Sequence, residues 1–133
     1  MASAALNLPL ALQPHHDGSA LYVPNQKPKL LDKVKVRIRI HDAIGRVKVV
    51  KARSSESGEA FPSAPAKVIK RDGKWSWYEA TIVMHNPKIN YRFSIELSGG
   101  EFLWYNTQGL TDLPPQDILD FRINTFSSTP SWS

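Results

Sequence analysis

Two tryptophans and a glutamate occupy alternate positions of one short stretch: Trp75, Trp77 and Glu79. Successive side chains of an extended chain point to opposite sides, so these three would share one side. A flat indole beside a carboxylate suits a pyranose ring, because the C–H groups of the sugar pack on the indole while its hydroxyls donate to the carboxylate. This spacing predicts a surface that can hold carbohydrate, if a sheet keeps the stretch extended.

Signals for catalysis are weaker. His15, His16 and Asp17 could be metal ligands or part of a triad, but adjacent side chains diverge on an extended chain and no further ligand has matching spacing. Glu79 and Glu96 could be the two carboxylates of a glycosidase, although paired surface carboxylates are common. The sequence has no cysteine, no nucleophile elbow and no phosphate or dinucleotide loop. We therefore predict no catalytic residue, no metal site and no cofactor.

A period of two dominates the chain and predicts the elements that would position these residues. Residues 33–40 alternate basic with branched apolar side chains, which is typical of a strand with one buried face. Its inward side chains would be Val34, Val36, Ile38 and Ile40. Further strands are expected over 47–53, 66–70, 75–84, 89–97, from 102 onward and over 120–126. About seven to eight short strands predict an all-β fold, an antiparallel β-sandwich.

Turn residues divide these strands. Asp72-Gly73 predicts a hairpin that ends before Trp75, and the composition of Ser54–Gly58 predicts a loop. Residues 114–119 are expected to form a short helical turn. We expect 1–14 to be a flexible N-terminus, 15–126 to be the sandwich domain, and 127–133 to be a linker toward a catalytic barrel that this sequence does not contain.

The pairing of 75–84 with 89–97 decides which aromatic residues face outward. The turn residues 85–88 predict a hairpin between them. With Met84 opposite Ile89, every inward pair would be apolar, which favours this register. The inward pairs would be Ile82–Tyr91, Ala80–Phe93 and Tyr78–Ile95.

The next turn extends this surface. Gly99-Gly100 is typical of a two-residue hairpin turn, whose register would place Trp104 opposite Ile95 in the core and send Tyr105 outward. The carbohydrate-binding residues predicted from this arrangement are Trp75, Trp77, Glu79, Arg92, Glu96 and Tyr105. For the two tryptophans, docking against another domain and plain packing are the alternatives to sugar contact.

Basic residues are concentrated in one half of the chain. Of 17 Lys and Arg, 14 lie between Lys27 and Lys74, and the formal net charge is +5. A basic half can indicate a polyanionic partner. A single-strand nucleic-acid binder would interleave aromatic with basic residues on one sheet, whereas here the basic strands carry no aromatic residue. We therefore expect no nucleic-acid partner.

The sequence also bears on location. No stretch approaches the ~20 apolar residues of a membrane-spanning helix. The apolar run 4–12 is interrupted by Asn7 and Pro9 and follows no basic residue, unlike a signal peptide. We expect no membrane partner and a cytoplasmic location.

Several short segments occur in the order and spacing of a known domain family. They are His16–Val23, Trp77–Thr81, Asn86-Pro87, Asn90–Phe93, Leu103–Asn106, Gly109-Leu110, Asp120–Ile123 and Thr129–Trp132. Together they resemble the N-terminal domain of maltogenic amylases, neopullulanases and cyclomaltodextrinases, which is the carbohydrate-binding module of family thirty-four. The resemblance extends over almost the whole chain.

The resemblance implies an immunoglobulin-like sandwich in front of the catalytic barrel of an α-amylase-superfamily glycoside hydrolase. Trp75, Trp77 and Trp104 match positions where the family often has aromatic residues, which adds Trp104 to the candidate site. The implied partners are an α-glucan polysaccharide or maltooligosaccharide, the barrel of the same chain, and a second copy through dimer contacts. The alternative is a purely structural domain that packs on the barrel or mediates dimerisation without binding sugar.

Overall fold

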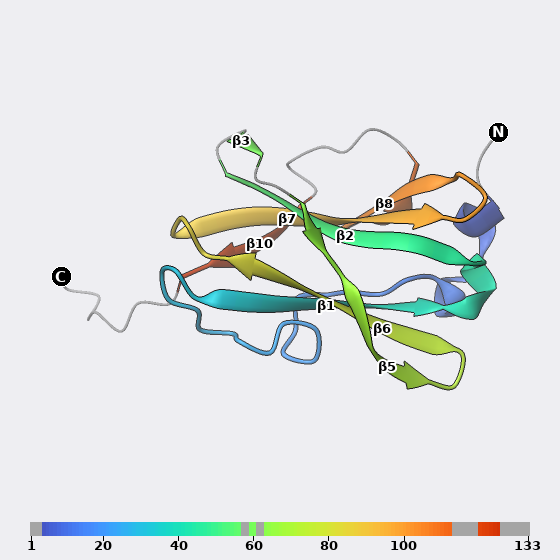
Figure 1. Cartoon of the computed structure of the whole chain (residues 1–133), viewed down its shortest axis with the longest axis horizontal. Helices are drawn as coiled ribbons and strands as arrows, with labels where there is room; N and C mark the ends of the chain where they lie inside the picture. Colours follow the sequence, from blue (N-terminus) through green and yellow to red (C-terminus); the bar gives the residue numbers. More distant parts are fainter. Residues whose placement is uncertain (1–3, 57–58, 61–62, 113–119, 126–133) are drawn as a thin grey trace.

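The computed structural model describes residues 4–56, 59–60, 63–112 and 120–125. Within them the chain forms two antiparallel sheets with a shared core, so the predicted β-sandwich is confirmed. The smaller sheet has the order β1-β6-β5. Its strands are β1 (Lys33–His41), β6 (Trp75–Val83) and β5 (Lys67–Asp72). Figure 1 shows β1 and β6 of this sheet below the strands of the larger one.

The larger sheet has β7 at its centre and follows the order β3-β2-β7-β8-β9, with β10 also paired to β7 and β4 to β2. Its three longer strands are β2 (Val47–Glu56), β7 (Lys88–Leu97) and β8 (Phe102–Asn106). Its short strands are β3 (Glu59–Ala60), β4 (Ala64–Pro65), β9 (Gly109–Thr111) and β10 (Phe121–Asn124).

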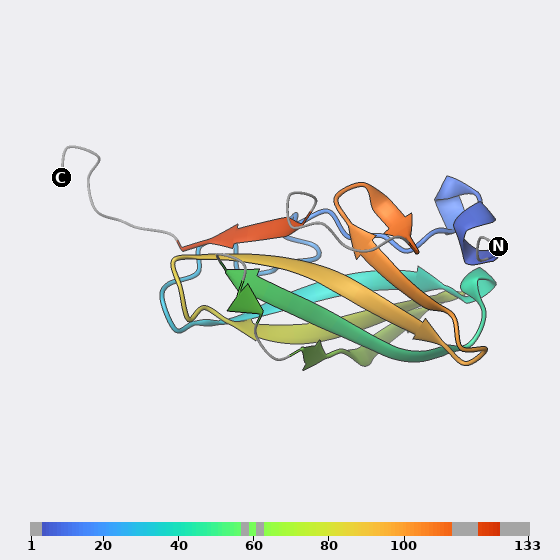
Figure 2. The ribbon, with the colours of Figure 1, turned by 90° about the horizontal axis from the view of Figure 1, so that it is seen from above.

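Three short 3-10 helices complete the described elements: η1 (Ala4–Asn7), η2 (Leu10–Leu12) and η3 (Asp42–Ile44). Within the part of 1–14 that is described, where we expected a flexible terminus, Leu6 and Leu8 pack against the core. Figure 2 shows η1 and η2 at one end of the sandwich, while β10 ends at the other. None of the described helices has the length and apolarity needed to span a membrane.

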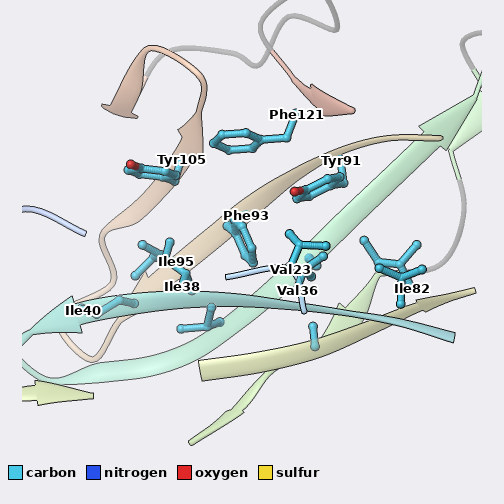
Figure 3. Packing of buried hydrophobic residues seen from close by; sticks show 14 of the residues in the cluster. Val23, Val36, Ile38, Ile40, Ile82, Tyr91, Phe93, Ile95, Tyr105 and Phe121 are labelled. Atoms are coloured by element: carbon cyan, nitrogen blue, oxygen red, sulfur yellow. The ribbon is translucent and has the colours of Figure 1, made fainter. Parts of the chain in front are cut away.

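Side chains of both sheets form the core. The predicted alternation in β1 is confirmed, since Val34, Val36, Ile38 and Ile40 are all buried. They face Tyr91, Phe93 and Ile95 of β7, as Figure 3 shows for most of this cluster. The hairpin predicted at Asp72-Gly73 is also confirmed, because Asp72 pairs with Trp75 and Gly73 has a φ of 62°.

The predicted hairpin between 75–84 and 89–97 is wrong. β6 pairs with β1 and β5, whereas β7 pairs with β2, β8 and β10 in the other sheet. The residues between β6 and β7 therefore cross from one sheet to the other. Both strands alternate in the same way because they cover one core from opposite sides, and a period of two specifies the buried side but not the bonded partner.

The predicted register of the turn at 98–101 is also wrong, by one residue. Ile95 pairs with Leu103 and Ser94 with Trp104. The turn is wider than two residues, because Leu97 N–H donates to the Glu101 carbonyl. A slip of one residue exchanges the two faces of the following strand, so every inside–outside prediction for β8 is reversed.

The loop predicted from the composition of Ser54–Gly58 is wrong for its first three residues, which belong to a strand. β2 continues to Glu56, with Ser54 opposite Tyr91 and Ser55 opposite Asn90. Strand pairing satisfies the backbone there, which outweighs the turn preference of serine. The predicted helical turn at 114–119 and the linker at 127–133 lie outside the described residues.

Candidate binding surface

Trp75, Trp77 and Glu79 project from the outer face of the smaller sheet, while Ser76 and Ala80 between and beside them are buried. Each of the three has a register partner on both neighbouring strands. The resulting rows are His41–Trp75–Asp72, Arg39–Trp77–Lys70 and Arg37–Glu79–Lys67. We call this surface the tryptophan face. Residues two apart in a strand are about 7 Å apart, so the two indoles project from neighbouring rows of the same face.

Trp77 is supported by a residue far away in the sequence. The ring of Tyr22 stacks on the indole, with centroids 5.2 Å apart and planes at 24°. Tyr22 belongs to a segment that lies along the free edge of β1, where its carbonyl accepts from Arg37 N–H at 2.8 Å and where His15 pairs with Arg39. The indole is half-buried, so part of it still reaches solvent.

Trp75 is also half-buried and has two polar neighbours. The guanidinium of Arg39 lies 4.7 Å from the ring centroid, within cation–π distance. The ring of His41 approaches edge-on at 4.9 Å. These contacts restrict the orientation of the indole.

The carboxylate of Glu79 is fixed by two cations of β1. Arg37 Nε lies 2.8 Å and Lys35 Nζ 3.3 Å from its oxygens. Burial alone would raise the pKa of Glu79, but the hydrogen bonds and charges of Arg37 and Lys35 outweigh it and lower the pKa. The group is therefore an ionised, oriented acceptor at neutral pH.

Three of the predicted site residues lie on the other side of the molecule. Arg92, Glu96 and Trp104 are on the outer face of the larger sheet, because β6 and β7 are not paired. Glu79 and Glu96 therefore face away from each other, and the hypothesis of a glycosidase carboxylate pair is wrong, since such a pair must flank one bond.

Trp104 was expected in the core from the turn register, but it lies half-buried on this second outer face. Its ring centroid is 5.3 Å from the Arg53 guanidinium and 5.8 Å from that of Arg92. Phe102 contacts it edge-on at 5.1 Å and is 47% exposed. We call Phe102, Trp104, Arg53 and Arg92 the Trp104 cluster.

Tyr105 was expected to face outward, but only 7% of it is exposed. Its ring is stacked with that of Phe121, as Figure 3 shows, and its hydroxyl accepts from His16 N–H at 3.2 Å. The one-residue shift in the register of β8 explains why Tyr105 is buried while Trp104 faces outward. Tyr105 therefore cannot stack on a ligand.

His16, a candidate metal ligand or triad member, is a structural residue between the sheets and is 2% exposed. Its Nδ1 donates to the Arg37 carbonyl at 2.6 Å, and its Nε2 accepts from the Tyr91 hydroxyl at 2.7 Å. Burial lowers the pKa of His16 from 6.5 to about 4. Within the described residues no three His, Cys, Asp or Glu side chains gather where a metal ion could bind.

A cavity of about 460 Å³ opens at the end of the sandwich, next to η3. Tyr78 lines it and packs against the core as expected, although the residue is only half-buried. Arg71, Asp42 and Ser76 also line the cavity. There Arg71 donates to both carboxylate oxygens of Asp42 at 3.1 Å and to Ser76 Oγ at 2.6 Å. Sequence reasoning missed this cavity, because Arg71 and Asp42 are 29 residues apart.

The sequence argument against a nucleic-acid partner also loses its basis. It relied on basic and aromatic strands being separate. In the sheet, the basic strands β1 and β5 lie on either side of β6, so that Arg39 and Lys70 flank Trp77. Sequence reasoning missed Tyr22, Arg37 and Arg39 as neighbours of the indoles for the same reason.

The two-sheet sandwich is of the immunoglobulin-like class, and a family profile identifies it further. The profile described as alpha amylase, N-terminal ig-like domain matches residues 15–126. The chain therefore belongs to this family of N-terminal domains of α-amylase-family enzymes.

Solved structures share the fold at low sequence identity. A cyclomaltodextrinase matches with a TM-score of 0.71 and 14% identity over 86% of this chain. A cycloalternan-forming enzyme from Listeria monocytogenes, in complex with a pentasaccharide substrate, matches with a TM-score of 0.61 and 14% identity over 85%. The chain spans only 19% and 10% of the lengths of these two proteins. A search of curated proteins finds no match.

Proposed function

We propose that this chain is a non-catalytic domain that binds an α-glucan and presents it to the catalytic barrel of an α-amylase-superfamily glycoside hydrolase. Starch, pullulan and maltooligosaccharides are the substrates that the family suggests. The observation that carries the proposal is the position of Trp75 and Trp77, side by side on one outer face with the ionised Glu79 next in line.

The chemistry of the tryptophan face supports a sugar polymer. Two indoles on residues about 7 Å apart along one strand offer apolar surface to the rings of a glucan chain. Glu79 accepts hydrogen bonds and Arg37 donates them, which suits the mixed donors and acceptors of sugar hydroxyls. Tyr22, Arg39 and His41 hold the indoles in place, so little side-chain freedom is lost on binding.

Native gel electrophoresis in soluble starch or pullulan tests the proposal, with the 133-residue chain as the protein. We expect retardation of the unmodified chain and its loss in Trp75→Ala and Trp77→Ala. Trp104→Ala is the matched control, because this indole is also half-buried and lies on an outer face, but of the opposite sheet. Equal retardation of all four proteins, or none at all, contradicts the proposal.

A purely structural role is the second candidate, and the Trp104 cluster favours it. A solvent-exposed Phe102 beside an indole and two arginines is an arrangement common at protein interfaces. The cluster would pack on the barrel or on a second copy of the chain. Absence of retardation, together with self-association that Trp104→Ala abolishes in sedimentation velocity, would favour this role.

A further inference from the structure

Cations flank the tryptophan face on both sides. In an antiparallel sheet, register partners project to the same side with Cβ atoms about 5 Å apart. The cationic partners of Trp77, Glu79 and Thr81 on this face are Lys35, Arg37 and Arg39 from β1 and Lys67 and Lys70 from β5. We call these five residues the cationic frame.

Most of the positive charge of the frame is not neutralised by the protein. Glu79 pairs with Lys35 and Arg37. Among the described residues, the side chains of Arg39, Lys67 and Lys70 have no carboxylate partner within 4 Å. The two cations that flank Trp77 are both in this second group.

Arg39 carries a second, independent sign that an acceptor is missing. Its Nε is buried and has no hydrogen-bond partner among the described residues, although its guanidinium is held over the ring of Trp75. Buried donors in folded proteins are nearly always satisfied, so an unpaired one needs a reason. An anionic group bound beside Trp75 and Trp77 would not reach this buried Nε, but it would offset the positive charge of the guanidinium.

We infer that the tryptophan face takes an α-glucan that carries phosphate monoesters, with sugar rings on Trp75 and Trp77 and phosphate groups between Arg39 and Lys70. This inference rests on the proposed function and specifies its substrate. A planar guanidinium and a lysine ammonium are the side chains that bind phosphate best, and here they lie on opposite sides of one indole.

A single-stranded nucleic acid is the competing polyanion, and Glu79 disfavours it. A nucleic acid has a phosphate on every unit, so its backbone would have to pass this carboxylate. Glu79 already pairs with Arg37 and Lys35, so these two cations are engaged and do not meet a backbone phosphate that passes this row. A glucan with sparse phosphate groups places neutral hydroxyls there instead.

The test compares naturally phosphorylated amylopectin with the same polymer after enzymatic dephosphorylation, in native gels of the 133-residue chain. We expect several-fold stronger retardation by the phosphorylated polymer, and the difference should shrink between low salt and about 0.15 M salt. Lys70→Gln and Arg39→Gln should reduce retardation to that of the dephosphorylated polymer. Lys51→Gln, an exposed lysine of the other sheet, is the control and should retain the preference.

Each other outcome contradicts the inference in a distinct way. Equal retardation by the two polymers overturns it but leaves the proposed function intact. No retardation by either polymer overturns the proposed function as well. If an oligonucleotide displaces the phosphorylated polymer, and Trp77→Ala abolishes oligonucleotide binding, the face binds nucleic acid instead. Lys70 is exposed, so its substitution tests the inference even if Arg39→Gln unfolds the chain.

Discussion

The ring of Tyr22 stacks on the indole of Trp77, although the two are 55 residues apart in the sequence and Trp77 lies on an outer face. The segment from His15 to Tyr22 therefore does more than close the edge of β1, because it supports one of the two indoles from the side. Binding at the tryptophan face should depend on this edge segment as well as on β6 itself.

Removal of this stacking should weaken glucan binding. Tyr22→Leu keeps apolar volume but removes a ring contact, which is worth about 0.5–1.5 kcal/mol in aromatic pairs. We expect a few-fold weaker retardation in starch gels, together with a loss of thermal stability because Tyr22 is only 3% exposed. Leu21→Ala, which changes an exposed neighbour, is the control. Unchanged retardation of Tyr22→Leu would show that Trp77 does not need this support.

Because of the observed register of β8, substitution of Tyr105 and of its neighbour Trp104 should have very different effects on stability. Tyr105→Ala should destabilise the fold by roughly 3–5 kcal/mol, because it empties a buried site beside Phe121 and breaks the contact with His16. Trp104→Ala should cost only about 1 kcal/mol, since it loses partly exposed cation–π contacts. Urea unfolding measures both. The reverse order of stabilities would support the register expected from the sequence.

Alternation in the sequence was sufficient to assign the buried side of β1, β6 and β7, as the burial of Ile38, Ala80 and Phe93 shows. It could not assign their partners. Two strands that cover the same core from opposite sheets have the same pattern as two strands of one hairpin. The fold class was therefore predictable. The predicted site, however, combined residues that lie on two opposite faces of the molecule.

Two other features had no local signal at all. The turn after Leu97 includes one more residue than the Gly-Gly dipeptide suggests. This one residue is why Tyr105 is buried and Trp104 lies on the outer face, the reverse of the prediction. The burial of His16 depends on Tyr91 and Arg37, which are 75 and 21 residues away. Contacts of this range are set by tertiary packing and not by spacing.

His16 should make stability depend on pH. Burial lowers its pKa from 6.5 to about 4, so between these values the unfolded chain binds a proton that the folded chain does not. Stability should therefore be complete above pH 6.5, fall as the pH drops toward 4, and level off below it. The loss is about 1.4 kcal/mol per pH unit and about 3 kcal/mol in all.

Urea midpoints measured across this range test the effect. His16→Gln cannot titrate, so its midpoints should vary much less between pH 6.5 and 4. His85→Gln, which changes an exposed histidine, should keep the slope of the unmodified chain. If His16→Gln shows the same slope as the unmodified chain, another group is responsible for the acid sensitivity.

The ion pair between Arg92 and Asp120 should be worth more than that between Arg71 and Asp42. The Arg92 and Asp120 side chains are 13% and 1% exposed, and the pair joins β7 to the residue before β10. Asp120→Ala removes the carboxylate that faces the largely buried Arg92 guanidinium and should cost about 3–5 kcal/mol. Asp42→Ala breaks a pair that is about half exposed and should cost under about 1 kcal/mol. Equal thermal shifts for the two variants would contradict this ranking.

The indole N–H resonances of the 133-residue chain give the most direct test of glucan binding at the tryptophan face. Single Trp→Phe variants assign them, and maltoheptaose is then titrated into the ¹⁵N-labelled protein. We expect the signals of Trp75 and Trp77 to shift together with one saturation curve while that of Trp104 stays unchanged. A shift confined to Trp104, or no shift at any indole with starch retardation still present, would contradict the assignment of the glucan to this face.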